Sequence, residues 1–258
     1  MKRILLSLLI FFSLCCSVSA TTYYYVAVHG QSNAYWGWSA ASLTGTDSGT
    51  PDARCHFSIN GTTWTATPYN AALNFCNTLV ASSKFDGKDI RVLMYGVPGA
   101  ALNSASKIDP YGYWLGTGST WWPTFQTYVT NAGGVMDADV WIQGETEGQF
   151  GDGGNYQTDL GTFFGQIRTG VGASTKIIVA GLNNYLSTTL WNGIRTKQQA
   201  ACTADGGAKF VDMSDLGVGV LHYSATDHAT VGTRLANALL TEQTVTGGTS
   251  QTTKLFPH

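Results

Sequence analysis

The chain has 258 residues, of which 43% are hydrophobic and only 12% are charged, and its formal net charge is −2. This length and composition fit one α/β domain with a full apolar core. The near-neutral charge argues against a nucleic-acid partner, because such a surface needs a stripe of basic side chains.

The first 20 residues have the layout of a secretory signal peptide. Residues 1–3 are basic after the initiator Met, residues 4–15 form an apolar run, and residues 18–20 are small. The apolar run is shorter than the roughly 20 residues that span a bilayer, which favours cleavage after Ala20 over an uncleaved anchor. We therefore expect a secreted protein, extracellular or periplasmic, without membrane contact after cleavage. Its domain would cover residues 21–243, followed by a flexible polar tail, residues 244–258.

Short apolar segments bounded by Gly, Asn, Asp or Ser predict five buried strands. They are Tyr23–Val28, Ile90–Val97, Ala138–Gln143, Lys176–Leu182 and Ala208–Val211. Helical patterns lie between them. Apolar residues repeat at i, i+4, i+7, i+8 and i+11 from Tyr156 to Ile167, and again at Val231, Leu235 and Leu239. Weaker patterns cover 69–82, 124–131 and 188–201.

Alternating strands and helices predict an α/β fold, a three-layer α/β/α sandwich around a parallel sheet. With five strands, the expected order is the flavodoxin-like 2-1-3-4-5, with the functional site at the carboxyl ends of the strands. The stretch 39–67 is rich in Ser, Thr and Gly, and we expect it to form a surface loop.

Three cysteines remain after the predicted cleavage. Export permits a disulfide, and Cys55 and Cys76 are the favoured pair because they flank one loop. Cys202 ends a helical pattern and is expected to be buried and unpaired. The Cys and His residues have no metal-ligand spacing, so we expect no metal and no cofactor.

Polar residues follow three of the predicted strands and precede the last helix. Ser32 follows the first strand, Gly99 the second, and Gln143 and Glu145 the third. A serine nucleophile needs a general base, for which His222 and His228 both qualify by position. Taken singly, each feature also has a plain structural explanation: a helix cap for Ser32, an ordinary turn for Gly99, and a helix start for either histidine.

Together, Gly30-Gln31-Ser32-Asn33, Gly99, Gln143-Gly144-Glu145 and a late histidine resemble the sialate O-acetylesterase-like branch of the SGNH hydrolases, which includes acetylxylan esterases. The resemblance implies that Ser32 is the nucleophile and that His222 is the catalytic histidine. It further implies oxyanion-hole donors at the Ser32 and Gly99 N–H groups and the Gln143 side chain. Glu145 matches a glutamate that orients the histidine in some members.

The sequence departs from the family pattern at one position. An aspartate usually stands three residues before the histidine, whereas Gly219 precedes His222 and Ala225 precedes His228 at that spacing. Glu145 or Asp215 could supply the missing acid, or a backbone carbonyl could hold the imidazole. The choice between His222 and His228 stays open at this point.

These features predict a secreted serine esterase that removes O-acetyl groups from an acetylated polysaccharide or sugar, of acetylxylan or sialate type, through an acyl-enzyme. Trp36 and Trp121, near the motifs, are candidates for stacking on sugar rings. Two alternatives remain: a carbohydrate-binding pseudoenzyme of the same fold, and a hydrolase of lipid or cell-wall acyl esters. We expect a monomer.

Overall fold

The computed structural model describes residues 21–66, 69–152 and 154–242. The predicted signal peptide, residues 1–20, and the predicted tail, residues 244–258, lie outside the described residues. Within the described part of the chain, no helix has the length and apolar character needed to cross a bilayer.

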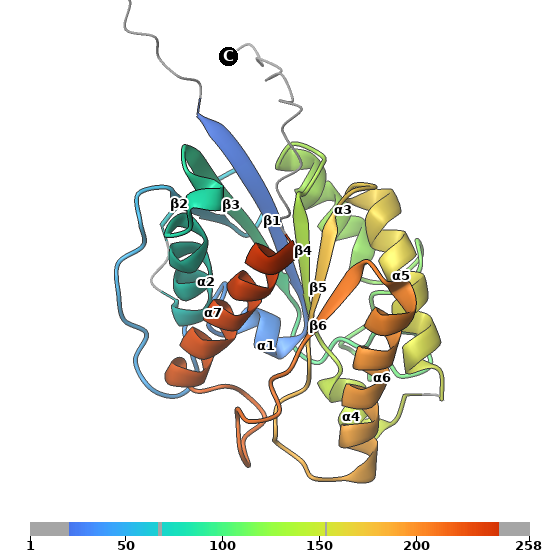
Figure 1. The fold of residues 1–258 in the computed structure, drawn as a ribbon. Helices are drawn as coiled ribbons and strands as arrows, with labels where there is room; N and C mark the ends of the chain where they lie inside the picture. Colours follow the sequence, from blue (N-terminus) through green and yellow to red (C-terminus); the bar gives the residue numbers. More distant parts are fainter. Residues whose placement is uncertain (1–20, 67–68, 153, 243–258) are drawn as a thin grey trace, which may run out of the picture.

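A parallel sheet forms the middle layer of the molecule (Figure 1). Its strands are β1 (Thr22–Gly30), β2 (Cys55–Ser58), β3 (Lys88–Gly96), β4 (Ala138–Ile142), β5 (Lys176–Ala180) and β6 (Ala208–Val211). They lie in the order β2-β3-β1-β4-β5-β6. The five predicted strands are β1 and β3 to β6, and their order is the predicted 2-1-3-4-5. The α/β/α expectation is therefore confirmed.

The sixth strand corrects the prediction that 39–67 is only a loop. β2 pairs with β3 from Cys55↔Ile90 to Ser58↔Leu93. Its four residues, Cys-His-Phe-Ser, carry too weak an apolar pattern to be recognised. Contacts with residues distant in sequence stabilise this strand: Phe57 is buried in the core, and Cys55 forms a disulfide with Cys76. That bond confirms the predicted disulfide, and Cys202 is free and buried as expected.

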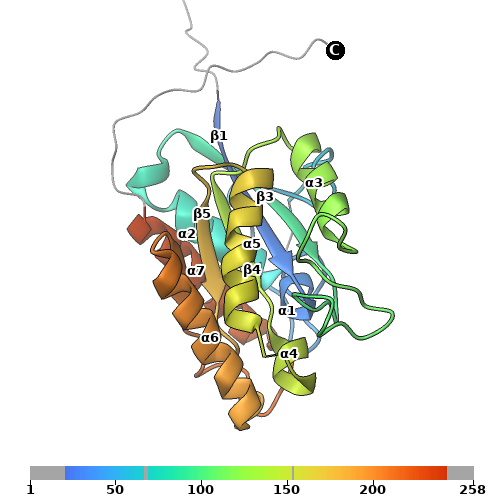
Figure 2. The ribbon, with the colours of Figure 1, turned by 90° about the vertical axis from the view of Figure 1, so that its right-hand side faces the viewer.

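Helices cover both faces of the sheet (Figures 1 and 2). The long ones are α2 (Asn70–Val80) and α7 (Ala225–Glu242) on one face, and α3 (Trp122–Asn131), α5 (Tyr156–Gly170) and α6 (Thr189–Asp205) on the other. The predicted stripe of α5 is fully buried. On the opposite face α2 and α7 pack closely, since a Cβ at Gly232 would lie 2.1 Å from the carbonyl oxygen of Ala71.

Two short helices lie at the carboxyl ends of the strands. α1 (Ser32–Tyr35) follows β1 and α4 (Glu145–Phe150) follows β4, its neighbour in the sheet. Figure 1 shows both at the lower edge, together with the segment that leads from β6 into α7. The fold thus gathers three of the predicted motifs at one edge of the sheet, as expected for an open parallel sheet.

Candidate active site

The serine after the first strand occupies a sharp turn at this edge. β1 ends at Gly30, α1 begins at Ser32, and Ser32 is only 4% exposed. Gly30 has a φ of +142°, and a Cβ there would lie 1.9 Å from the carbonyl oxygen of Ile142. Only glycine fits such a position. The Ser32 hydroxyl makes no hydrogen bond to any described residue, so no internal acceptor competes for its proton.

Gln31 ties this turn to the end of β4. Its N–H donates to the carbonyl oxygen of Ile142 at 2.9 Å. Its Oε1 accepts from the backbone N–H groups of Gly144 at 3.4 Å and Thr146 at 3.2 Å. The side chain is buried, so these bonds are shielded from water. The serine turn and the start of α4 therefore move as one unit.

The loop that carries Gly99 is fastened to α4. Thr146 Oγ1 donates to the carbonyl oxygen of Gly99 at 3.1 Å, and Glu147 Oε1 accepts from the N–H of Leu102 at 2.6 Å. Gly99 has a φ of +76°, and its own N–H makes no hydrogen bond to the described residues. An N–H that is held in place and unpaired can donate to an oxyanion. Glu147, which sequence analysis missed, is the buried anchor of this loop.

The side chain of Gln143, predicted as an oxyanion donor, makes its hydrogen bonds inside the protein. Its Nε2 lies within hydrogen-bond distance of Gln31 Oε1 (3.1 Å), the Ala100 carbonyl oxygen (3.3 Å) and a carboxylate oxygen of Glu147. Its Oε1 accepts from the hydroxyl of Tyr156 at 3.0 Å. An amide nitrogen has only two hydrogens, and both have acceptors inside the protein. Gln143 therefore joins the serine turn to the Gly99 loop.

His222 lies in the segment between β6 and α7, and the backbone on both sides of it is anchored. Asn33 Nδ2 donates to the carbonyl oxygen of Leu221 at 3.1 Å, and Asn33 Oδ1 accepts from the N–H of Tyr223 at 3.3 Å. Asn183 Nδ2 donates to the Leu221 carbonyl oxygen as well, at 3.1 Å. Burial lowers the pKa of His222, so its imidazole is neutral at pH 7 and able to accept a proton.

Glu145 is a buried carboxyl group beside this anchor. Its Oε1 accepts from Asn33 Nδ2 at 2.6 Å, while its buried Oε2 makes no hydrogen bond to the described residues. Burial raises the pKa of Glu145 to about 7, against which the bond from Asn33 acts. Burial likewise raises the pKa of Glu147 to about 7. The bonded partner of Glu145 is thus Asn33, and no bond joins Glu145 to His222.

The structure places both alternate residues away from this role. Asp215 forms a two-bond ion pair with Arg234, at 2.5 and 2.6 Å, on the surface. His228 is completely buried in α7, with its ring against Gly37 and its edge toward Tyr223, 5.5 Å between centroids. Neither ring nitrogen of His228 has a hydrogen-bond partner among the described residues. His228 is therefore a core residue, and Asp215 is a surface ion-pair partner.

No acid stands in for the family's aspartate at its usual place. Gly219 is exposed, has a φ of +71°, and has nothing within 4 Å of where a Cβ would be. Asp227 is occupied at a helix start: its Oδ2 accepts from the Ser224 N–H at 3.4 Å, and its own N–H donates to Ser224 Oγ at 3.1 Å. This reciprocal pair is a capping box at the start of α7.

The predicted sugar-stacking tryptophans are both partly exposed, and a tyrosine lies against Gly99. Trp121 Nε1 donates to the carbonyl oxygen of Tyr111 at 2.7 Å. The ring of Tyr111 lies against Gly99, where a Cβ would come within 2.6 Å of it, and Tyr111 is 47% exposed. Trp36 is packed against Tyr35, with ring centroids 4.7 Å apart. Three other tryptophans near the motifs are core residues: Trp38, Trp114 and Trp122.

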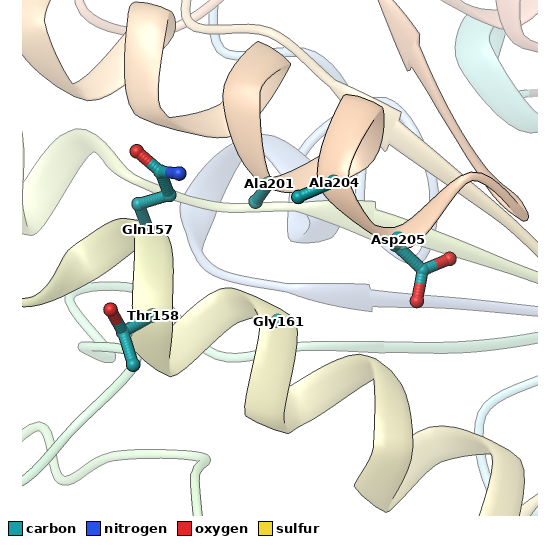
Figure 3. A pocket seen from close by; sticks show the side chains of 6 residues that line it. All are labelled: Gln157, Thr158, Gly161, Ala201, Ala204 and Asp205. Carbon is teal, nitrogen blue, oxygen red and sulfur yellow. The ribbon is translucent and has the colours of Figure 1, made fainter.

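Two hollows on the surface of the described residues lie away from these side chains. One, of about 280 Å³, lies between α5 and α6 (Figure 3). It is lined by Gln157, Thr158, Gly161, Ala201, Ala204 and Asp205. Another, of about 270 Å³, is lined by residues of α6 and of the β6 end.

Comparison with known protein families decides the family. The model of the family described as carbohydrate esterase, sialic acid-specific acetylesterase, matches residues 69–241. The chain belongs to this family. The matched range of this carbohydrate esterase family member includes Gly99, Gln143, Glu145 and His222, while Ser32 lies before it. No functionally curated protein matches the chain.

Solved structures share the fold at low sequence identity. A carbohydrate acetylesterase from Xanthomonas citri is 22% identical with a TM-score of 0.60, covering 83% of this chain and 55% of that one. The chain therefore spans about half of that protein. An Arabidopsis thaliana protein is 16% identical (TM-score 0.62, covering 86% and 98%). An acetylxylan esterase from Geobacillus stearothermophilus is 12% identical (TM-score 0.53, covering 86% and 94%). These likenesses show the SGNH-type α/β fold.

Proposed function

We propose that this protein is a secreted serine esterase that removes O-acetyl groups from carbohydrate through an acyl-enzyme, with Ser32 as nucleophile and His222 as general base. The observation that carries this proposal is the Asn33 bridge: the residue next to Ser32 is hydrogen-bonded to the main chain on both sides of His222. A serine and a neutral histidine held together at the carboxyl edge of an α/β sheet are the parts that acyl transfer needs.

The proposed chemistry proceeds in two balanced steps. His222 takes the Ser32 proton as Oγ attacks the acetyl carbonyl, and the sugar hydroxyl leaves with that proton. Water then gives a proton to His222 and attacks the acetyl-serine, which releases acetate and restores Ser32. The N–H groups of Ser32 and Gly99 stabilise the oxyanion in both steps, and losing one such donor typically costs about 10²–10³ in kcat.

Support for a carbohydrate substrate comes from the family and from the rim of the site. The family's own description names carbohydrate esterases. The ring of Tyr111, a residue that is 47% exposed, adjoins Gly99. A ring beside the oxyanion loop can cover the apolar face of a sugar whose acetyl group reaches Ser32. We propose an acetylated xylan-type polymer as the first substrate to test and an O-acetylated sialic acid as the second.

Secretion rests on two features of the chain. Residues 1–20 have the layout of a signal peptide, and Cys55 and Cys76 are joined in a disulfide, which is typical of exported proteins. Expression of the full chain, with mass spectrometry of the exported product, would show whether cleavage follows Ala20. An intact N-terminus on exported protein would contradict this part of the proposal.

The direct test is the hydrolysis of p-nitrophenyl acetate and acetylated xylan by the wild type and three variants. Ser32→Ala and His222→Ala should each lower kcat by at least about 10³-fold, since the two residues act as one unit. Asp215→Asn is the control, because it changes only a surface ion pair, and it should keep the wild-type rate. An Ser32→Ala variant with the wild-type rate would refute the serine mechanism.

One observation favours a second candidate, a carbohydrate-binding protein without turnover: no carboxylate is bonded to His222, and Gly219 replaces the family's aspartate. Such a protein would bind acetylated xylan in a calorimeter and leave its acetyl groups in place. Release of acetate by the folded wild type distinguishes the two.

A further inference from the structure

We propose that Asn33 is the positioning residue of this site, and that Glu145 acts on His222 through Asn33 rather than by contact. The inference rests on the proposed function and names how the histidine is held without the usual aspartate. Asn33 is 1% exposed and makes three hydrogen bonds, one to α4 and two to the segment between β6 and α7.

The orientation of the Asn33 amide is determined by its partners. Nδ2 faces two acceptors, Glu145 Oε1 at 2.6 Å and the Leu221 carbonyl oxygen at 3.1 Å. Oδ1 faces one donor, the N–H of Tyr223 at 3.3 Å. Turning the amide by 180° would set its oxygen against two acceptors and its NH₂ against a donor. Only one orientation satisfies all three bonds, so the group is a rigid connector.

These bonds fix the backbone of His222 from both sides. The Leu221 carbonyl belongs to the peptide unit before the Cα of His222, and the Tyr223 N–H belongs to the unit after it. Holding both planar units leaves the two backbone dihedrals of His222 little freedom. Only the side-chain torsions remain adjustable, and a histidine has two of them. Asn183 gives the preceding unit a second support.

The same residue sets the separation of base and nucleophile, because Asn33 directly follows Ser32. The segment before His222 has little packing of its own: Val218 is 71% and Val220 is 47% exposed. A segment with few buried contacts opens at low free-energy cost. Its bonds to Asn33 and Asn183, together with the hydrogen bond from the Gly219 N–H to the Asn184 carbonyl, hold the backbone that carries the imidazole.

Glu145 supplies the acceptor in this arrangement, and because its pKa is raised to about 7 it carries its full negative charge only above pH 7. A hydrogen bond from an amide to a carboxylate is shorter and stronger than one between neutral groups, which fits the 2.6 Å distance. Glu145 thus orients the Asn33 NH₂ group, which also donates a hydrogen bond to the Leu221 carbonyl oxygen. Asp215 and Asp227, the other acids nearest to His222 in sequence, are taken up by Arg234 and Ser224.

A double-mutant cycle tests whether Glu145 acts through Asn33. Asn33→Ala should lower kcat on acetylated xylan by about 100-fold, the usual cost of displacing a catalytic group by about 1 Å, with KM close to that of the wild type. Glu145→Gln should lower kcat less. The double variant should have the same kcat as Asn33→Ala alone. Glu145 acts on His222 only through the Asn33 amide, which is already absent in that variant. Multiplicative losses would overturn the inference. Asn33→Asp, which cannot donate either bond when ionised, replaces Asn33→Ala if that variant does not fold.

Asn70→Ala is the matched control for a merely structural role. Asn70 is also buried and also uses its amide between segments, donating to the Ala225 carbonyl at 2.8 Å and accepting from Ser48 N–H at 2.9 Å. It should lower the melting temperature as much as Asn33→Ala and keep the wild-type kcat. Equal losses of kcat in both variants would overturn the positioning role. Ser32→Ala could be inactive while the losses of kcat in Asn33→Ala and Glu145→Gln multiply in the double variant. In that case only the inference about Asn33 fails, and the proposed function stands.

Discussion

Tyr111 is the single residue whose replacement should separate sugar binding from ester chemistry. Its ring lies on Gly99 and is nearly half exposed, so it can stack on a sugar without contacting the acetyl group. Tyr111→Ala should raise KM for acetylated xylan by up to about tenfold, since an aromatic contact of this kind contributes about 0.5–1.5 kcal/mol beyond area burial. The rate on triacetin, an acetyl ester without a ring, should stay unchanged. Initial rates on both substrates measure the difference.

Two further variants make the Tyr111 result specific. Tyr111→Phe keeps the ring and should bind xylan as the wild type does. Tyr23→Ala removes an aromatic that is 38% exposed at the start of β1, at the opposite end of that strand from Ser32, and should change neither rate. Equal losses on xylan and triacetin in Tyr111→Ala would mean that the ring only supports the Gly99 loop.

Single residues of the site were predictable where their type and their place after a strand carry the signal. Ser32, after the first strand, and His222, before the last helix, are of this kind as candidates, and hydrogen bonds from Asn33 join their segments. Asn33 and Gln31 are not, because the role of an amide depends on its partners, and the Leu221 carbonyl is 188 residues away from Asn33. Glu147 had a visible signal, a second acid just after a buried strand. The interior acceptors of the Gln143 amide could not be seen in the sequence, because they lie on other segments of the chain.

At the scale of elements, the Cys55–Cys76 disulfide should be the main support of β2. It closes a loop across 21 residues and joins this edge strand to α2. For a loop of that length, the loss of the cross-link costs about 3 kcal/mol of unfolding free energy. The double variant Cys55→Ser, Cys76→Ser should therefore show a lower urea midpoint than the wild type. Cys202→Ser serves as the control, since Cys202 is unpaired. Equal midpoints for wild type and double variant would contradict this account.

Elements with strong periodicity were predictable, and β2 was not. The stripe of α5 from Tyr156 to Ile167 is apolar at every position that the fold buries. The central strands are continuous apolar runs because both of their faces are covered. β2 has only four residues at an edge, and its position is set by β3 and by a disulfide to α2. Contacts of this kind, with residues distant in sequence, cannot be predicted from the pattern of apolar residues within the strand.

On the scale of the whole molecule, buried ionisable groups give stability two opposing pH dependences. Burial raises the pKa of both Glu145 and Glu147 to about 7. Between the unfolded pKa, near 4.5, and pH 7 the native state then holds more protons than the unfolded state. The free energy of unfolding therefore falls as pH rises through this window. His228 acts in the opposite sense, because burial lowers its pKa to about 4.

His228 should make the protein acid-labile, and His228→Phe should remove that part of the lability. The unfolded imidazole takes up a proton near pH 6.5 and the native one only near 4, with weaker opposing effects from Asp47 and Asp227. The stabilisation is thus complete above pH 6.5 and is lost as pH falls toward 4. A difference of 2.5 pKa units corresponds to about 3 kcal/mol. Phenylalanine keeps a ring against Gly37 and Tyr223 but cannot titrate. Urea midpoints of both proteins between pH 4 and 7 should diverge, with the wild type losing more stability at acid pH. Parallel curves would mean that native His228 takes up its proton at nearly the same pH as in the unfolded chain, which would contradict this account.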